Sequence, residues 1–277
     1  MFLGHMTVIK PYYSPLQLKK VVRKARLRLL ELHHNAHAGH IGGNLSCIDS
    51  LVVLYDAVLS EDDAFVLSKG HSAGALYVAL WSCGLLTDAD LQTFAQDGTR
   101  LGVHTPANLI PSVLFGTGSL GHGPSLAAGL ALGKRLQGIP GRVFCLCSDG
   151  EWQEGSCWES LIFAVHQKLS NLHLVLDVNG LQAFGTTVEV ASLDLENLAG
   201  RLTAFGAAVA TCDGHDLPAL VEHLNRPEDG QRPSVLLLRT CKGKGLPFLE
   251  NSLASHYWPL TDEQYFQGRA IIEDDDA

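Results

Sequence analysis

The chain has 277 residues and a formal net charge of −9 at neutral pH. Hydrophobic residues make up 46% of it and charged residues 18%, a balance typical of a folded chain with a full core and not of a disordered one. The negative charge argues against a nucleic-acid or anionic-membrane surface, because both need a basic patch. No apolar run approaches the roughly 20 residues that span a bilayer, and the start, Met1–His5, lacks the blocks of a signal peptide.

The cysteines give no indication of a disulfide framework. There are seven, an odd number, and none forms a C-x-x-C motif. Cys145 and Cys147 fall in an apolar run and are expected to pack there as small hydrophobic residues. A reducing, cytoplasmic location is therefore expected. No repeat or linker divides the sequence, so we expect one domain over residues 1–277, with the acidic tail 273–276 as a solvated end.

The first 135 residues are predicted to be mostly helical, with Gly- and His-rich loops between the helices. The basic stretch 19–28 resembles a transit peptide or a membrane-surface helix. However, apolar residues recur through it at steps of three and four, which is the pattern of an ordinary amphipathic helix packed on a core. These residues are Leu18, Val22, Ala25, Leu29 and Leu32.

The rest of the chain is predicted to alternate between strands and helices. Strands are expected at 143–147, 172–178, 207–211 and 235–239, and helices at 124–136, 155–168 and 217–224. In the helix over 155–168, one face is expected to carry Trp158, Leu161, Ile162 and Val165. Such alternation with short connections predicts an α/β fold, a parallel sheet with helices on both faces. Ligands of such folds bind at the carboxyl edge of the sheet.

A glycine-rich loop, Gly116–Gly121, matches the G-x-G-x-x-G fingerprint of dinucleotide-binding folds. It follows a short apolar run, Val113–Phe115, and precedes a predicted helix. Ile110-Pro111 and this short run make a poor first strand, and the next acidic residue, Asp149, lies about ten residues beyond the roughly 20-residue spacing expected. Dinucleotide binding and a plain structural turn both remain alternatives for this loop.

A stronger pattern links Asp149-Gly150-Glu151 with Asn179-Gly180-Leu181. Both segments follow predicted strands, with one helix between them, so a parallel sheet would bring them together. Magnesium prefers carboxylate, amide and carbonyl oxygens, and it favours phosphates as its remaining ligands. Asp149, Asn179 and the carbonyl of Leu181 could supply three oxygens, while Gly150 allows close approach of the backbone. The alternative is that Asp-Gly and Asn-Gly form ordinary turns.

The segment from Ser148-Asp149-Gly150 to Asn179 resembles the thiamine diphosphate signature, with Ser148 in place of the usual first glycine. Seven further segments resemble transketolase motifs. Five are loops: Ala38–Gly43 (with Ile41 for proline), Leu67–His71, Gly102–Pro106, Gly116–Gly123 (with Ser119 for proline and His122 for glutamine) and Ser255-His256. The other two, Gln153–Gly155 and Trp158-Glu159, resemble the helix after the metal site. The resemblance covers nearly the whole chain and identifies the amino-terminal, diphosphate-binding domain of transketolase.

The resemblance implies roles for four histidines among the thirteen in the chain. His40, His71 and His104 would line the substrate channel as catalytic groups, and His256 would bind the diphosphate or the substrate. Imidazole suits hydroxyl and carbonyl chemistry, since it exchanges protons near neutral pH. The implied cofactor contacts are His71, Gly118, Ser119, Leu120, Asp149, Gly150, Glu151, Asn179 and His256. Glu154 and Glu159 would lie at the subunit contact.

The sequence thus predicts a magnesium- and thiamine diphosphate-dependent transfer of a two-carbon ketol unit from a ketose to an aldehyde. The glutamate that activates the cofactor belongs, in transketolases, to a pyrimidine-binding domain that follows the one seen here. We expect a separate C-terminal subunit to supply it, in a heterotetramer. The alternatives are thiamine-dependent acyl or acyloin transfer, a non-catalytic subunit that retains the fold and, from another class, a nicotinamide oxidoreductase.

Overall fold

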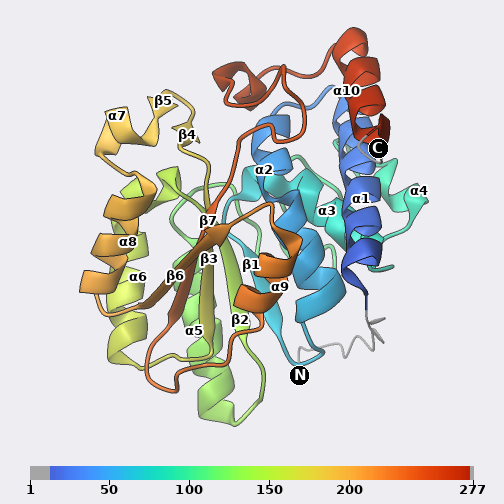
Figure 1. Cartoon of the computed structure of the whole chain (residues 1–277). Coiled ribbons are helices and arrows are strands. Elements are labelled where there is room, and N and C mark those ends of the chain that lie inside the picture. Colours follow the sequence, from blue (N-terminus) through green and yellow to red (C-terminus); the bar gives the residue numbers. More distant parts are fainter. Residues whose placement is uncertain (1–12, 275–277) are drawn as a thin grey trace.

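A five-stranded parallel sheet forms the centre of the molecule, with the strand order β1-β2-β3-β7-β6 (Figure 1). The computed structural model describes residues 13–274, so the predictions about Met1–His5 and about the end of the acidic tail lie outside the described residues. Every neighbouring pair in this sheet runs parallel. The strands are β1 (Ala64–Leu67), β2 (Val143–Ser148), β3 (Leu172–Val178), β6 (Ala208–Asp213) and β7 (Ser234–Arg239).

The inner strands are buried on both faces, which explains why the sequence shows continuous apolar runs instead of alternation. In β2, Val143, Cys145 and Cys147 pack into the core on one face of the sheet. Phe144 and Leu146 pack into the core on the other. Both cysteines are fully buried free thiols, as predicted.

Helices cover both faces, which confirms the predicted fold class (Figure 1). One face carries α1 (Pro15–Asn35), α2 (Ile41–Val53), α3 (Ala73–Ser82) and α9 (Leu217–Leu224). The other carries α5 (Gly123–Gln137), α6 (Gly155–His166) and α8 (Leu195–Ala204). The remaining elements are η1 (Leu54–Val58), η2 (Gly70–Ser72), α4 (Asp88–Leu91), η3 (Gly150–Gln153), the hairpin β4 (Leu181–Gln182) and β5 (Gly185–Thr186), α7 (Thr187–Ala191), η4 (Leu253–His256) and α10 (Asp262–Asp274).

The helix α2 lies at the centre of its layer and continues into η1. Together they form an 18-residue run, Ile41–Val58, with a mean hydropathy of 1.3. By length and composition this run could cross a membrane, which differs from the expectation that no apolar run approaches that length. This is the one such helix within residues 13–274, and 94% of the run is buried inside the protein. A core helix of a folded domain has the same properties, so this run is weak evidence for a membrane span.

Three details differ from the sequence-based expectations. The first 135 residues contain a strand, β1, whose four residues are all buried and therefore show no alternation. Ile162 is 51% exposed and does not share the buried face of Leu161 in α6. No strand leads directly into the loop Gly116–Gly121, since the element before it is α4, so the dinucleotide fingerprint lacks the structural context that it requires.

Candidate functional site

Polar residues from four neighbouring strands meet at the carboxyl edge of the sheet. In sheet order they are Lys69 after β1, Asp149 after β2, Asn179 after β3 and Lys242 after β7. The hairpin β4–β5 and the segment around η4 lie at this same end of the sheet (Figure 1). This is the edge where parallel α/β sheets bind their ligands.

The structure brings together the two segments that were predicted to bind magnesium. The backbone N–H of Gly180 donates to Oδ2 of Asp149 at 2.6 Å, and the N–H of Gly150 donates to Oδ1 at 2.8 Å. The amide oxygen of Asn179 accepts from the N–H of Leu181 at 3.1 Å. Asp149 and the turn 179–181 therefore form one oxygen-rich corner.

This corner fits a magnesium ion. Asp149 is 1% exposed, and burial together with the negative charge of Asp177 raises its pKa to about 6. A buried carboxylate in this state lacks a compensating charge, which a divalent cation would supply. Within residues 13–274, no three His, Cys, Asp or Glu side chains gather as a metal site. The ligands would therefore be one carboxylate with amide and peptide oxygens, a set that suits magnesium.

A buried ion pair lies beneath this corner and was not predicted from the sequence. Lys69 donates to Asp177, and both side chains are 0% exposed. Burial alone would raise the pKa of Asp177, but Lys69 and the hydroxyls of Ser46 and Thr240 hold it below its usual value. Asp177 also accepts from Nδ2 of Asn179 at 3.3 Å. The pair thus stays charged. Because Asp177 binds Nδ2 of Asn179, the amide oxygen of Asn179 points away from Asp177.

The four predicted histidines form one cluster. The ring centroid of His40 is 5.6 Å from that of His71, 5.8 Å from that of His104 and 5.0 Å from that of His256. The rings of His71 and His256 are 6.1 Å apart. These residues come from four separate loops, so the cluster exists only in the folded chain.

Burial keeps these imidazoles neutral. With the help of neighbouring positive groups it lowers the pKa of His40 and of His256 to about 4. It lowers the pKa of His71 well below its ordinary value, and it also lowers that of His104. A neutral imidazole has one donor and one acceptor nitrogen, so near pH 7 each ring can either donate a hydrogen bond to a hydroxyl group or accept one from it.

Asn44 organises this cluster and was not predicted. Its side-chain nitrogen donates to the carbonyls of His40 at 2.8 Å and of His71 at 3.0 Å. Its oxygen accepts from the N–H of Ala75 at 2.8 Å. One buried amide therefore ties the start of α2 to the loop after β1. His40 itself has a left-handed backbone with φ of 65°, a conformation that this bracing helps to maintain.

Lys242 is a second residue that sequence reasoning missed. Its ammonium lies 2.9 Å from Nδ1 of His256, and the residue is 3% exposed. Burial and the nearby Lys69 lower the pKa of Lys242 to about 8. The amine therefore remains mostly charged at pH 7 and can bind an anion.

The glycine-rich loop packs against the histidine loops. Thr117 donates to the carbonyl of Leu67 at 2.6 Å and, through its N–H, to the carbonyl of Thr105 at 3.1 Å. A Cβ on Gly118 would lie 2.9 Å from the ring of His104, so only glycine allows this approach. The predicted contacts of Gly118, Ser119 and Leu120 with the cofactor's pyrimidine ring stay predictions.

The carboxylate of Glu151, a predicted cofactor contact, is fully buried. It accepts from the hydroxyl of Ser68, from the N–H of Gly121 at 2.8 Å and from the N–H of Ser148 at 3.2 Å. The side chain therefore braces three loops of the site. Ser148, which replaces the usual glycine, ends β2 and is not among the described residues with positive φ, so a serine fits there without strain.

Glu154 and Glu159, which were expected at a subunit contact, are both exposed at α6. A Cβ on Gly121 would lie 2.6 Å from Cβ of Glu154, so this glutamate lies directly beside the glycine-rich loop. A face of α6 next to the site is thus open to a partner.

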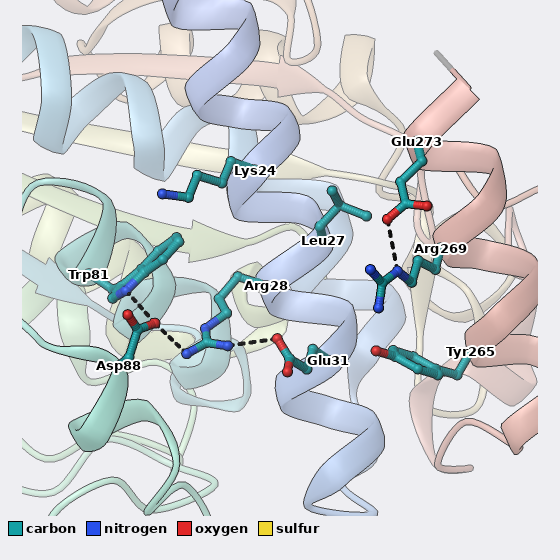
Figure 2. A pocket seen from close by; sticks show the side chains of 9 residues that line it. All are labelled: Lys24, Leu27, Arg28, Glu31, Trp81, Asp88, Tyr265, Arg269 and Glu273. Carbon is teal, nitrogen blue, oxygen red and sulfur yellow. Dashed lines mark hydrogen bonds and ion pairs between the residues drawn. The ribbon is translucent and has the colours of Figure 1, made fainter. Parts of the chain in front are cut away.

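A different hollow, shown in Figure 2, has a volume of about 320 Å³ and lies between α1, α10 and the segment of Trp81 and Asp88. Most of its charged groups pair with one another: Arg28 contacts Glu31 and Asp88, and Arg269 contacts Glu273, while the ammonium of Lys24 lies over the ring of Trp81. None of the predicted site residues lines it, so it is separate from the histidine cluster.

Comparison with known proteins agrees with this arrangement. Residues 18–273 match the family model described as transketolase, thiamine diphosphate binding domain. The chain is 36% identical over 252 residues to one subunit of the apulose-4-phosphate transketolase of Phocaeicola vulgatus, covering 87% of this chain and 89% of that protein. It is 36% identical over 249 residues to a 6-deoxy-6-sulfo-D-fructose transketolase subunit of a Clostridium species, covering 86% and 90%.

Solved structures show the same fold. The transketolase of Campylobacter jejuni superposes with a TM-score of 0.84 at 28% identity, over 94% of this chain and 43% of that one. The transketolase of Leishmania mexicana has a TM-score of 0.82 at 23% identity, over 92% and 44%. The chain thus spans about two fifths of these full-length transketolases and nearly all of the subunit-sized relatives. The chain belongs to the transketolase family, in which it is a thiamine diphosphate-binding domain.

Proposed function

We propose that this chain is the N-terminal subunit of a two-component transketolase, which moves a two-carbon ketol unit from a ketose to an aldehyde. The observation that carries this proposal is the juxtaposition of the oxygen-rich corner at Asp149 and Asn179 with the cluster of four neutral histidines. Relatives that match along most of their own length are named as transketolase subunits, which supports a division of the enzyme between two chains.

The residues divide between holding the cofactor and handling the substrate. When bound, thiamine diphosphate supplies the carbon that carries the ketol unit. Asp149, Asn179 and the Leu181 carbonyl would bind Mg²⁺ and through it the diphosphate. Lys242 and His256 would donate hydrogen bonds to the same anion. His40 and His104 would hold the hydroxyl groups of the sugar and exchange protons with them, and His71 would contribute to both tasks.

The partner subunit would cover the open side of the site. Three aromatic side chains are exposed at this end of the molecule: Phe184 by 88%, Trp258 by 70% and Tyr257 by 53%. The hydroxyl of Tyr257 donates to the carbonyl of Ala183 at 3.3 Å, so these aromatics lie close together. We propose that the C-terminal subunit covers them, brings the glutamate that activates the cofactor, and forms a heterotetramer. A cytoplasmic location would suit the free thiols.

The test is reconstitution with the candidate C-terminal subunit. The two chains would be co-expressed, purified together and supplied with Mg²⁺ and thiamine diphosphate. Ketol transfer would then be followed with a panel of ketose donors and aldehyde acceptors. Phosphorylated and sulfonated ketoses come first in the panel, because two relatives are named for such sugars. A complex that retains the cofactor but transfers no ketol unit from any of these donors would contradict the proposed activity.

A further inference from the structure

A chain of hydrogen bonds connects the helical layer to Lys242. Arg26 in α1 binds Asp49 in α2 through two contacts, Nε to Oδ1 at 2.9 Å and Nη2 to Oδ2 at 2.5 Å. Oδ2 of Asp49 also lies 2.8 Å from Nδ1 of His215. The other ring nitrogen of His215, Nε2, accepts the backbone N–H of Cys241 at 3.0 Å. Cys241 is the residue directly before Lys242.

These contacts fix the proton position on His215. A backbone N–H can only donate, so Nε2 must be the unprotonated nitrogen. The proton is therefore on Nδ1, where it is donated to Asp49. Burial alone would raise the pKa of Asp49, but Arg26 and His215 hold it below its usual value, so the acceptor is an ionised carboxylate. Carboxylate–histidine pairs of this kind orient the functional group beyond them.

The segment after β7 receives this support at its first turn, 242–245. The N–H of Gly243 donates to the carbonyl of Gly42 at 2.9 Å, and Nη1 of Arg26 donates to the carbonyl of Lys244 at 2.8 Å. Lys242 lies between the contacts of Cys241 and Gly243, with its ammonium against His256. The other charged groups that act on Lys242 are Lys69, Asp149 and Asp177. Lys69 repels the ammonium and the two carboxylates attract it, so these charges alone do not hold it against His256, and the position of its backbone matters.

We propose that His215 is a positioning residue, which fixes the Cys241 peptide and thereby holds Lys242 against His256. The role of Lys242 in binding the diphosphate rests on the proposed function, whereas the hydrogen bond from Cys241 to His215 is independent of it. The side-chain partners of His215 and those of the histidine cluster are different residues, so His215 acts on the site through the backbone.

The surroundings of His215 make it suitable for substitution. His215, Arg26 and Asp49 line a cavity of about 600 Å³ between α1, the start of α9 and α10. A side chain that borders a cavity can be replaced with less overpacking than one in a close-packed core. Two variants separate its two contacts. Asparagine places an amide near the position of Nδ1 and can still donate to Asp49, whereas glutamine extends to the position of Nε2 and can still accept from Cys241.

The experiment compares His215→Asn and His215→Gln with wild type and with a control, His166→Asn, on the exposed surface of α6. Three quantities would be measured on the full chain: hydrogen exchange of the Cys241 amide by NMR, the side-chain amine signal of Lys242 in ¹⁵N-lysine spectra, and the affinity for Mg²⁺–thiamine diphosphate by calorimetry. For His215→Asn we expect faster exchange, a shifted Lys242 signal and affinity weakened by about tenfold or more. For His215→Gln all three should stay close to wild type.

Two results would overturn the proposal. If both His215 variants lose exchange protection, the Lys242 signal and affinity equally, the residue only stabilises the fold. If neither variant loses any of them, His215 does not position Lys242. If the wild-type chain binds no thiamine diphosphate, the proposed function fails. The exchange rate of Cys241 and the Lys242 signal still decide the positioning role in that case, because neither needs the cofactor. Melting temperatures recorded alongside identify any variant that fails to fold. If His215→Asn fails, His215→Gln is compared with wild type and with the control His166→Asn.

Discussion

Two buried carboxylates at neighbouring strand ends of this site differ in how their negative charge is compensated. Asp177 is buried with Lys69 and two hydroxyl groups, so its charge is compensated within the chain. Asp149 accepts from the backbone N–H groups of Gly150 and Gly180, and its pKa is raised to about 6. The difference lies in the supply of positive charge, because both side chains are almost completely buried. The uncompensated carboxylate is the one that faces the proposed Mg²⁺.

Removing that carboxylate should abolish metal-dependent cofactor binding. We expect Asp149→Ala to lose Mg²⁺-dependent affinity for thiamine diphosphate, because it deletes the one charged ligand. The fold should persist, since the change also removes a buried charge that is costly without a cation. Calorimetry with and without Mg²⁺ measures the loss, and Asp62→Ala, on an exposed acid before β1, is the control. Unchanged affinity in Asp149→Ala would refute the magnesium assignment.

A different result is expected in the histidine cluster, because His104 is proposed to contact the substrate and not the cofactor. His104→Ala should keep the affinity for thiamine diphosphate but reduce turnover of the reconstituted complex by about 10²–10⁴, which is the usual cost of removing a positioned acid–base group. His122→Ala, in the nearby glycine-rich loop, should change neither quantity by much. Collapse of cofactor binding, with a normal rate at saturating cofactor, would instead place His104 in the cofactor site.

At the scale of elements, sequence patterns predicted the inner sheet well. The bounds of β3 and α9 agree with the prediction, because turn residues such as Asn179-Gly180 mark their ends. β1 was missed because four buried residues show neither the alternation of a half-exposed strand nor the length of a longer one. The Asp149–Asn179 corner could be predicted, since adjacent parallel strands must bring their ends together. Lys242 and Asn44 could not, because their contacts with His256 and His71 depend on irregular turns that show no periodic pattern in the sequence.

Strand β3 also carries a histidine that should make the fold sensitive to acid. His173 stacks on Phe144 with 4.8 Å between ring centroids, and burial lowers its pKa to about 4. A folded-state pKa below the unfolded value of about 6.5 means that stability is fully present above pH 6.5 and is lost as the pH falls toward 4. The loss from this one group should be roughly 2 kcal/mol between pH 7 and pH 5.

The variant His173→Phe tests this prediction. Phenylalanine keeps a ring in the stack but cannot be protonated, so the free energy of unfolding should fall less steeply with acid than in wild type. Urea unfolding at pH 7 and pH 5 gives the two slopes. Leu136→Ser, on a side chain that is 75% exposed and does not titrate, is the control and should leave the slope unchanged. Equal slopes in His173→Phe and wild type would show that folding leaves the pKa of this histidine unchanged.

At the scale of the whole molecule, the exposed face of α6 is expected to be a subunit contact. Glu154 lies beside the glycine-rich loop at the start of this helix. Glu159 is exposed further along it, and Ile162 and Phe163 are exposed on the same helix by 51% and 41%. Glu159→Lys should therefore weaken assembly with the C-terminal subunit before it affects chemistry, through an unfavourable charge at the contact. Sedimentation of the complex over a range of concentrations measures this. A variant that assembles normally but turns over slowly would place Glu159 in the active site instead.

The last prediction concerns the isolated chain. The oxygen-rich corner, Lys242 and His256 are proposed to bind the diphosphate end of the cofactor, but the glutamate that must contact the pyrimidine ring is expected from the other subunit. The chain alone should therefore bind thiamine diphosphate weakly, transfer no ketol unit, and self-associate through the exposed aromatics Phe184, Tyr257 and Trp258. Adding the C-terminal subunit should convert it to a heterotetramer with two active sites at subunit contacts.

Light scattering coupled to size exclusion, with ketol-transfer assays on each fraction, measures assembly and activity together. Trp258→Ser should reduce self-association of the isolated chain, because it removes an apolar side chain that is 70% exposed. The same change should weaken the heterotetramer, since the C-terminal subunit is expected to cover this side chain. Leu136→Ser, on a side chain that is 75% exposed near the end of α5, is the control. Full activity in a fraction that contains this chain alone would mean that it supplies every catalytic group itself, and the two-component assignment would then be wrong.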